Sequence, residues 1–215
     1  MKTINLTSPR EIPIIEQDRK GRDVKMARVV GIGHQDFAQL ISGGIFYIDK
    51  TALIKEWWEN DDAVTLITRP RRFGKTLNMS MLEQFFSTEY AGRKDLFEHL
   101  SIWKEEKYQK LQGTLPVIAL SFADVKENTF TDAKKKICQI IRNLYNRYDF
   151  LLKSSCLNDD EKEWYWKVSA HMENHVASES LKVLSKYLAS YYGKKVIILL
   201  DEYDTPMQEA YVYGY

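Results

Sequence analysis

A chain of 215 residues is long enough for one ordinary domain, and its 44% hydrophobic and 28% charged residues exclude a wholly disordered protein. The formal net charge of +1 gives no global indication of a nucleic-acid or membrane partner. The two cysteines have no metal or redox spacing, and the amino terminus lacks the apolar stretch of a signal peptide. The longest apolar run, residues 196–200, is too short to span a bilayer. These features predict a cytoplasmic protein with no membrane partner.

The first part of the chain differs in character from the rest. Residues 1–28 are polar and contain two prolines, which predicts a loosely docked N-terminal extension ahead of a domain over residues 29–215. Residues 45–48 follow a glycine pair and read as a short strand. Either Asp49 or Thr51 is then placed to cap a helix.

A strand, a loop and a helix are predicted next. Residues 64–68 are rich in β-branched side chains and favour a buried strand. Residues 69–73 form a loop, and a helix begins near Lys75. Its apolar face consists of Leu77, Met81, Leu82 and Phe85.

The remaining elements alternate between strands and helices. A strand is predicted over residues 117–122, followed by a long amphipathic helix with apolar residues three and four apart, from Ile137 to Leu152. Residues 163–192 are helical, with a break near Ser178 and a stop at Gly193. Residues 196–200 are apolar at every position, which predicts a parallel strand covered on both faces. The alternation indicates an α/β layer fold.

The loop after the first strand carries a phosphate-binding pattern. The sequence Arg69-Pro-Arg-Arg-Phe-Gly-Lys-Thr76 matches the last three positions of the signature G-x-x-x-x-G-K-[ST], with Arg69 at the first glycine. Gly74 lets the backbone approach phosphates, Lys75 reaches the β- and γ-phosphates, and Thr76 is a Mg²⁺ ligand. The predicted nucleotide-binding residues are Arg69, Pro70, Arg71, Arg72, Phe73, Gly74, Lys75, Thr76 and Leu77.

An acidic pair completes the predicted site. Asp201 and Glu202 directly follow the apolar strand, at the end where open α/β sheets bind ligands. Asp201 is predicted to hold Mg²⁺, and Glu202 to act as the catalytic base on the attacking water, with Lys75 as its catalytic partner. The two motifs together indicate a P-loop NTPase three-layer fold, binding ATP and Mg²⁺, with a parallel sheet and a helical insertion between the motifs.

Three stretches resemble the predicted AAA-ATPase-like family of bacteria: Phe46-Tyr-Ile-Asp-Lys-Thr51, then residues 66–80, then residues 197–206. The resemblance covers most of the chain, and it implies an ATP-binding domain in which an arginine at position 69 is usual. Members of that family usually continue into a domain similar to PD-(D/E)XK nucleases. The resemblance therefore implies a nuclease-like domain or partner chain beyond Tyr215, and an ATPase fold that is incomplete at its C-terminal side.

Several alternatives stay open. The chain is either an ATP-hydrolysing module coupled to an effector, or a module that binds nucleotide or nucleic acid without hydrolysis, with Arg69, Arg71 and Arg72 as candidate nucleic-acid contacts. A P-loop kinase is disfavoured, because no acceptor-binding segment is recognisable.

Four further residues are less specific signals. Asp49 and Lys50 either lie near the nucleotide or are a helix cap and a surface lysine. His171 and His175, four apart on a predicted helix, favour a solvated face over a metal site.

The end of the chain allows one prediction about the sheet. Proteins with this acidic motif usually place another strand between the two motif strands, and the residues after 200 are too few to supply it after a helix. We therefore expect strands 64–68 and 196–200 to share a sheet with an open slot between them, or to pair only loosely. Such a slot would make the isolated chain marginally stable.

Overall fold

The computed structural model describes residues 16–17, 23–24, 33–68 and 73–215. They divide into two compact units, which are described separately. The first unit is Met1–Phe85 with Tyr90–Gln112, and the second is Phe86–Glu89 with Gly113–Tyr215. Most of the predicted N-terminal extension, and the loop residues Arg69 to Arg72, lie outside the described residues.

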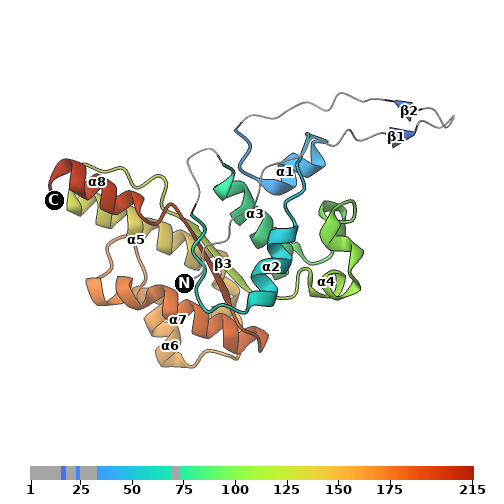
Figure 1. The fold of residues 1–215 in the computed structure, drawn as a ribbon. Helices are drawn as coiled ribbons and strands as arrows, with labels where there is room; N and C mark the ends of the chain where they lie inside the picture. Colours follow the sequence, from blue (N-terminus) through green and yellow to red (C-terminus); the bar gives the residue numbers. More distant parts are fainter. Residues whose placement is uncertain (1–15, 18–22, 25–32, 69–72) are drawn as a thin grey trace. The chain divides into compact units, whose positions relative to one another are not determined.

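The first unit is mainly helical (Figure 1). Its strands β1 and β2 are two residues long and pair with each other in antiparallel orientation. Its elements are β1 (Glu16–Gln17), β2 (Asp23–Val24), α1 (Phe37–Ser42), α2 (Ala52–Asn60), most of α3 (Lys75–Phe86), the 3₁₀ helices η2 (Lys94–Leu96) and η3 (Ser101–Lys104), and α4 (Glu106–Leu111).

Two predicted strands are absent from this unit. Residues 45–48 and 64–68 have no regular secondary structure, and Val64 is 73% exposed. A β-rich sequence becomes a strand only where a neighbouring backbone completes its hydrogen bonds, and the described residues give neither segment such a partner. The strand predictions for residues 45–48 and 64–68 are therefore wrong, and so is the predicted slot beside 64–68.

Aromatic rings form the core of the first unit. Phe37 of α1 stacks on Phe97, with ring centroids 5.2 Å apart, and Phe85 of α3 meets Phe97 edge-on at 5.1 Å. The Phe37 backbone N–H also donates to Ser80 Oγ on α3, at 3.0 Å. This packing fixes α1 against α3, because offset and edge-on ring pairs are directional as well as apolar.

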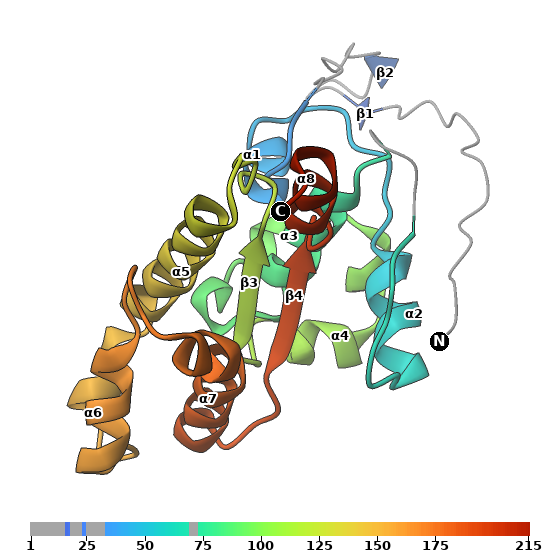
Figure 2. The same ribbon diagram turned by 90° about the vertical axis from the view of Figure 1, so that its left-hand side faces the viewer.

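The second unit contains a parallel pair of strands. Strand β3 (Val117–Ser121) pairs with β4 (Ile197–Asp201) from Val117 opposite Ile197 to Ser121 opposite Asp201, and Figure 2 shows the strands side by side. A parallel pair needs a long crossover, which is supplied here by helices. The other elements are η1 (Thr88–Tyr90, shared between the units), α5 (Phe130–Arg147), η4 (Asp149–Lys153), α6 (Asp159–Lys167), α7 (Asn174–Tyr192) and α8 (Thr205–Tyr213).

The sheet is covered unevenly. Ile118 and Leu120 of β3 are buried in the cluster that α5 and α7 form with the sheet. Their register partners on β4, Ile198 and Leu200, remain 43% and 40% exposed. The prediction that residues 196–200 are covered on both faces is therefore wrong, because the helices of this unit cover the β3 half of the face more completely than the β4 half.

The predicted helices agree with the structure except at their ends. The amphipathic helix α5 ends at Arg147, and Leu151 and Leu152 lie beyond it in the 3₁₀ helix η4. The break in the following helical region falls at residues 168–173, between α6 and α7, and not near Ser178. Gly193 ends α7 in a left-handed conformation, with φ at +63°, which is the conformation that glycine commonly adopts at the end of a helix. Among the described residues, no helix has both the length and the apolar character needed to cross a bilayer.

Candidate functional site

The described part of the predicted phosphate loop begins at Phe73, which is 57% exposed. Gly74 has φ at +73°, a left-handed conformation that residues with a side chain rarely adopt. Helix α3 begins at Lys75, as predicted, and the Asn78 N–H donates to the Gly74 carbonyl at 2.9 Å. The first turn of α3 contains no acidic residue, so its own side chains do not compensate the positive end of the helix dipole.

A second lysine stands beside this loop. A Cβ atom added at Gly74 would lie 3.7 Å from Lys50 Nζ, and among the described residues no other heavy atom outside the loop lies within 4 Å of that position. Lys50 is half-buried and lies just before α2. The sequence singled out Lys50 through the stretch 46–51, but the proximity to Gly74 could not be read from residues 24 positions apart.

The segment that carries Lys50 is held by the Asp49 carboxylate. Asp49 Oδ1 accepts hydrogen bonds from the Thr51 N–H at 2.8 Å and the Thr51 hydroxyl at 2.6 Å. Asp49 Oδ2 accepts from the Ser101 N–H at 2.7 Å. Burial alone would raise the pKa of Asp49, but the hydrogen bonds from Thr51 and Ser101 outweigh it and hold this pKa below its ordinary value of 3.8. Asp49 thus joins the start of α2 to η3.

We expect Asp49→Asn to destabilise the protein by about 1 kcal/mol at pH 7, because an amide offers one acceptor oxygen where the carboxylate uses two. Because solvent reaches this carboxylate and screens its interactions, we expect the loss of folding stability to be no larger than this value. Since the folded-state pKa is lowered, the stabilisation is present above pH 3.8 and is lost as pH falls through the folded-state pKa. Urea unfolding of both proteins at pH 7 and at pH 3 measures this, and an equal difference at the two pH values would contradict it.

The predicted acidic pair lies where the sequence placed it, at the carboxyl end of β4. Asp201 is the last residue of the strand, and its carbonyl accepts from the Phe122 N–H at 3.0 Å. Glu202 follows with φ at +49°, left-handed although it carries a side chain. The Glu202 carbonyl accepts from the Thr205 N–H at 3.1 Å, at the start of α8. Both acidic residues are half-buried.

Residues near this pair have ordinary structural contacts. Ser121, at the end of β3, is the register partner of Asp201, and its hydroxyl accepts from the Ala123 N–H at 3.3 Å. Asp204 precedes α8 without a side-chain cap and accepts from Gln208 Nε2 at 2.6 Å. Gly74, Lys75 and Thr76 belong to the first unit, whereas the acidic pair belongs to the second.

The two histidines do not share a helix face. His171 lies in the turn before α7, and His175 lies in its first turn with Nδ1 3.3 Å from a Glu173 carboxylate oxygen. The prediction that both lie on one helix is wrong, because α7 begins only at Asn174. The described residues contain no group of three or more His, Cys, Asp or Glu side chains arranged to hold a metal.

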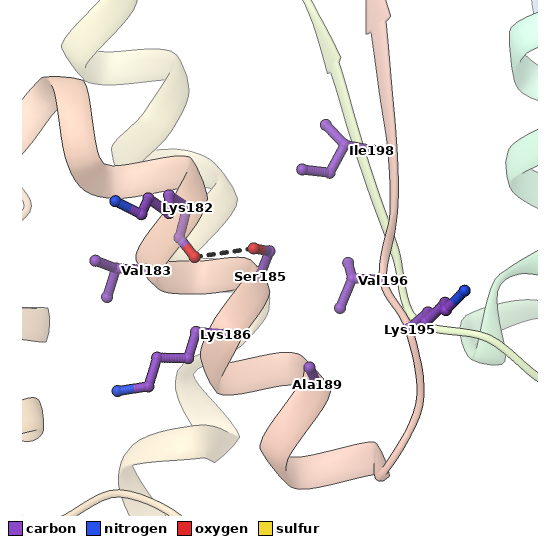
Figure 3. Close-up of a pocket in the computed structure, with 8 residues that line it drawn as sticks. All are labelled: Lys182, Val183, Ser185, Lys186, Ala189, Lys195, Val196 and Ile198. Atoms are coloured by element: carbon purple, nitrogen blue, oxygen red, sulfur yellow. Dashed lines mark hydrogen bonds between the residues drawn. The ribbon is translucent and has the colours of Figure 1, made fainter. Parts of the chain in front are cut away.

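A separate cavity of about 590 Å³ lies between α7 and β4 in the second unit (Figure 3). Its apolar lining includes Ile198, and its rim carries Lys182, Lys186 and Lys195. Lys182 is paired with Glu179 at 3.0 Å and Lys186 with Glu161 at 3.3 Å. These paired surface lysines indicate a solvated rim, and the cavity adjoins the amino end of β4, opposite to the end that carries Asp201.

Comparison with known proteins gives the family of the chain. The sequence model described as "Predicted AAA-ATPase" matches residues 31–214. A relative from Azotobacter chroococcum mcd 1, described as an uncharacterized protein in the vnfD 5' region, is 26% identical over 177 residues. The match covers 82% of this chain and 29% of the relative, so the chain spans less than a third of that relative. No solved structure matches. Because the family model covers most of the chain, this protein belongs to the predicted AAA-ATPase family.

Proposed function

We propose that this chain binds ATP with Mg²⁺ at the loop before α3 and hydrolyses it, in a P-loop fold of three layers. The observation that carries the proposal is Gly74, left-handed at the start of α3 with the Lys50 ammonium beside it, inside the segment matched by the family model. A glycine in this conformation brings backbone N–H groups towards an anion, and the helix dipole favours negative charge there.

A buried amide one turn further along α3 also supports a polar ligand. Asn78 is 1% exposed, and its Nδ2 has no hydrogen-bond partner among the residues that the structure describes. A buried donor left unpaired costs about 1–3 kcal/mol, so such groups usually have a role to explain them. Side chains of a helix lean towards its amino terminus, which for Asn78 is the Gly74 turn.

Each residue has a definite task in this proposal. Lys75 binds the β- and γ-phosphate oxygens, and the Thr76 hydroxyl and the Asp201 carboxylate hold the metal, with Glu202 orienting and deprotonating the attacking water. When bound with the triphosphate, Mg²⁺ would neutralise negative charge that develops on the transferred phosphoryl group. Arg69, Pro70, Arg71, Arg72, Phe73 and Leu77 are proposed as further nucleotide contacts around the loop.

Lys75→Ala tests the site. We expect it to weaken ATP binding by about 10- to 100-fold, because a hydrogen bond from a charged group contributes about 1.5–3 kcal/mol. Titration calorimetry with ATP and Mg²⁺ measures the affinity, and Lys110→Ala on α4, a lysine paired with Glu106, is the matched control. Unchanged ATP affinity in Lys75→Ala would contradict the phosphate-loop assignment.

We propose further that nucleotide turnover drives an effector. The curated relative is much longer than this chain, and the nuclease-like domain implied by the resemblance is the effector that we propose. If ATP binds without measurable turnover, a non-hydrolysing nucleotide-binding module is the better description.

A further inference from the structure

We infer that Lys50 is a second phosphate-binding cation of the nucleotide site, supplied by the segment before α2. This inference rests on the proposed function and adds to it a residue outside the phosphate-loop motif. Its starting point is the position of Lys50 Nζ, 3.7 Å from where a Cβ of Gly74 would stand. An ammonium group held there lies against the glycine at which a bound phosphate approaches the backbone most closely.

The backbone of Lys50 is fixed from both sides. The Lys50 N–H donates to the Tyr47 hydroxyl at 3.3 Å, and that hydroxyl donates to Met81 Sδ on α3, also at 3.3 Å. The Lys50 carbonyl accepts from the Leu53 N–H at 3.0 Å, in the first turn of α2. Tyr47 therefore links this segment to the same helix that begins at the phosphate loop.

The neighbouring residue adds a second support. Asp49 binds Thr51 and the Ser101 N–H, which ties the segment to η3. Ser101 Oγ also lies 3.0 Å from Thr51 Oγ1. With its flanking residues held by α3, α2 and η3, Lys50 loses little further backbone freedom when a ligand binds. Such preorganisation increases the affinity gained from each contact.

The chemistry of the ligand calls for a second cation. A nucleoside triphosphate carries several negative charges along one chain of phosphates, and a lysine ammonium is a compact point charge suited to them. Lys50 is half-buried, so its attraction to a phosphate is screened less than that of a fully exposed lysine. Lys50 therefore contacts the phosphates of the bound nucleotide and not its base or sugar.

The test compares the affinity of four proteins for ATP, ADP and adenosine by titration calorimetry: the full chain and its variants Lys50→Met, Lys50→Arg and Lys55→Met. Lys50→Met keeps the aliphatic stem and removes the charge, and Lys50→Arg keeps the charge. Lys55, on α2 and paired with Glu105 at 2.6 Å, is the matched control. We expect Lys50→Met to lose about tenfold in ATP affinity and little in adenosine affinity, with Lys50→Arg within about threefold of the full chain.

The outcomes separate this inference from the function on which it rests. If the full chain binds ATP and Lys75→Ala loses binding while Lys50→Met does not, Lys50 is a surface lysine and the inference is wrong. An equal loss for ATP and adenosine also overturns it, since that is a structural effect. If the full chain fails to bind ATP, the proposed function fails and the inference with it. If Lys50→Met unfolds, as judged by circular dichroism, Lys50→Gln takes its place in the same comparison.

Discussion

Glu202→Gln is expected to lower the rate of ATP hydrolysis by about 10²- to 10⁴-fold while ATP affinity changes by less than about threefold. A positioned general base contributes about that factor to a hydrolytic rate, and glutamine keeps the size and shape of glutamate without its basic oxygen. The position of Glu202 supports this role, since it directly follows β4 and its backbone is held by the turn into α8. Phosphate release under single-turnover conditions measures the rate.

The matched control is Glu209→Gln on α8, the same substitution in the same unit. It should hydrolyse ATP at the rate of the unmodified chain. Glu202→Gln with full activity would exclude Glu202 as the base. A chain that binds ATP but has the same low rate with and without Glu202 would favour the non-hydrolysing alternative.

Leu184→Ala is expected to destabilise the protein by about 2–5 kcal/mol. Leu184 is 0% exposed and belongs to the cluster that joins α5, α7 and β3. Truncation removes the transfer free energy of the lost methyl groups and leaves a cavity that a close-packed interior fills only in part. Urea unfolding followed by far-UV circular dichroism gives the free energy, and tryptophan fluorescence gives a second probe, since Trp164 packs near Tyr145 in the same cluster.

Lys182→Ala, at an exposed position two residues earlier on α7, is the control for this measurement. Its contact with Glu179 is an exposed pair three residues apart, which contributes at most a few tenths of a kcal/mol. A Leu184→Ala variant that unfolds at the same urea concentration as Lys182→Ala would contradict the arrangement of α7 described above.

Helical periodicity was the most reliable signal in this sequence. The apolar spacing in α3 and α5, and the glycine that ends α7, placed those elements within a few residues, because each signal is local. The strands β3 and β4 were also recognised from their apolar runs. Residues 64–68 have equally high β propensity, but a strand also needs a neighbour, and sequence propensity does not say whether one is present.

The sequence motifs name the candidate residues, and the structure adds one contact that no motif gives. Gly74, Lys75, Asp201 and Glu202 were identified from motifs, and the structure places the first pair at the start of α3 and the second pair at the end of β4. For Lys50 the sequence leaves two interpretations open, a position near the nucleotide and a solvated surface lysine, and it does not decide between them. Its place beside Gly74 depends on the packing of the segment before α2 against α3, which no local pattern encodes.

The left-handed backbone of Glu202 has a consequence for how this protein changes under selection. This conformation costs a residue with a side chain about 1 kcal/mol or more, whereas glycine adopts it at almost no cost. A library of variants at position 202 that is selected only for thermal stability should therefore enrich glycine and asparagine. A library selected for ATP turnover should return glutamate. Glutamate at position 202 would then lower folding stability in return for catalytic activity. A redesign guided by stability alone that replaced Glu202 would give a more stable protein that binds nucleotide without hydrolysing it.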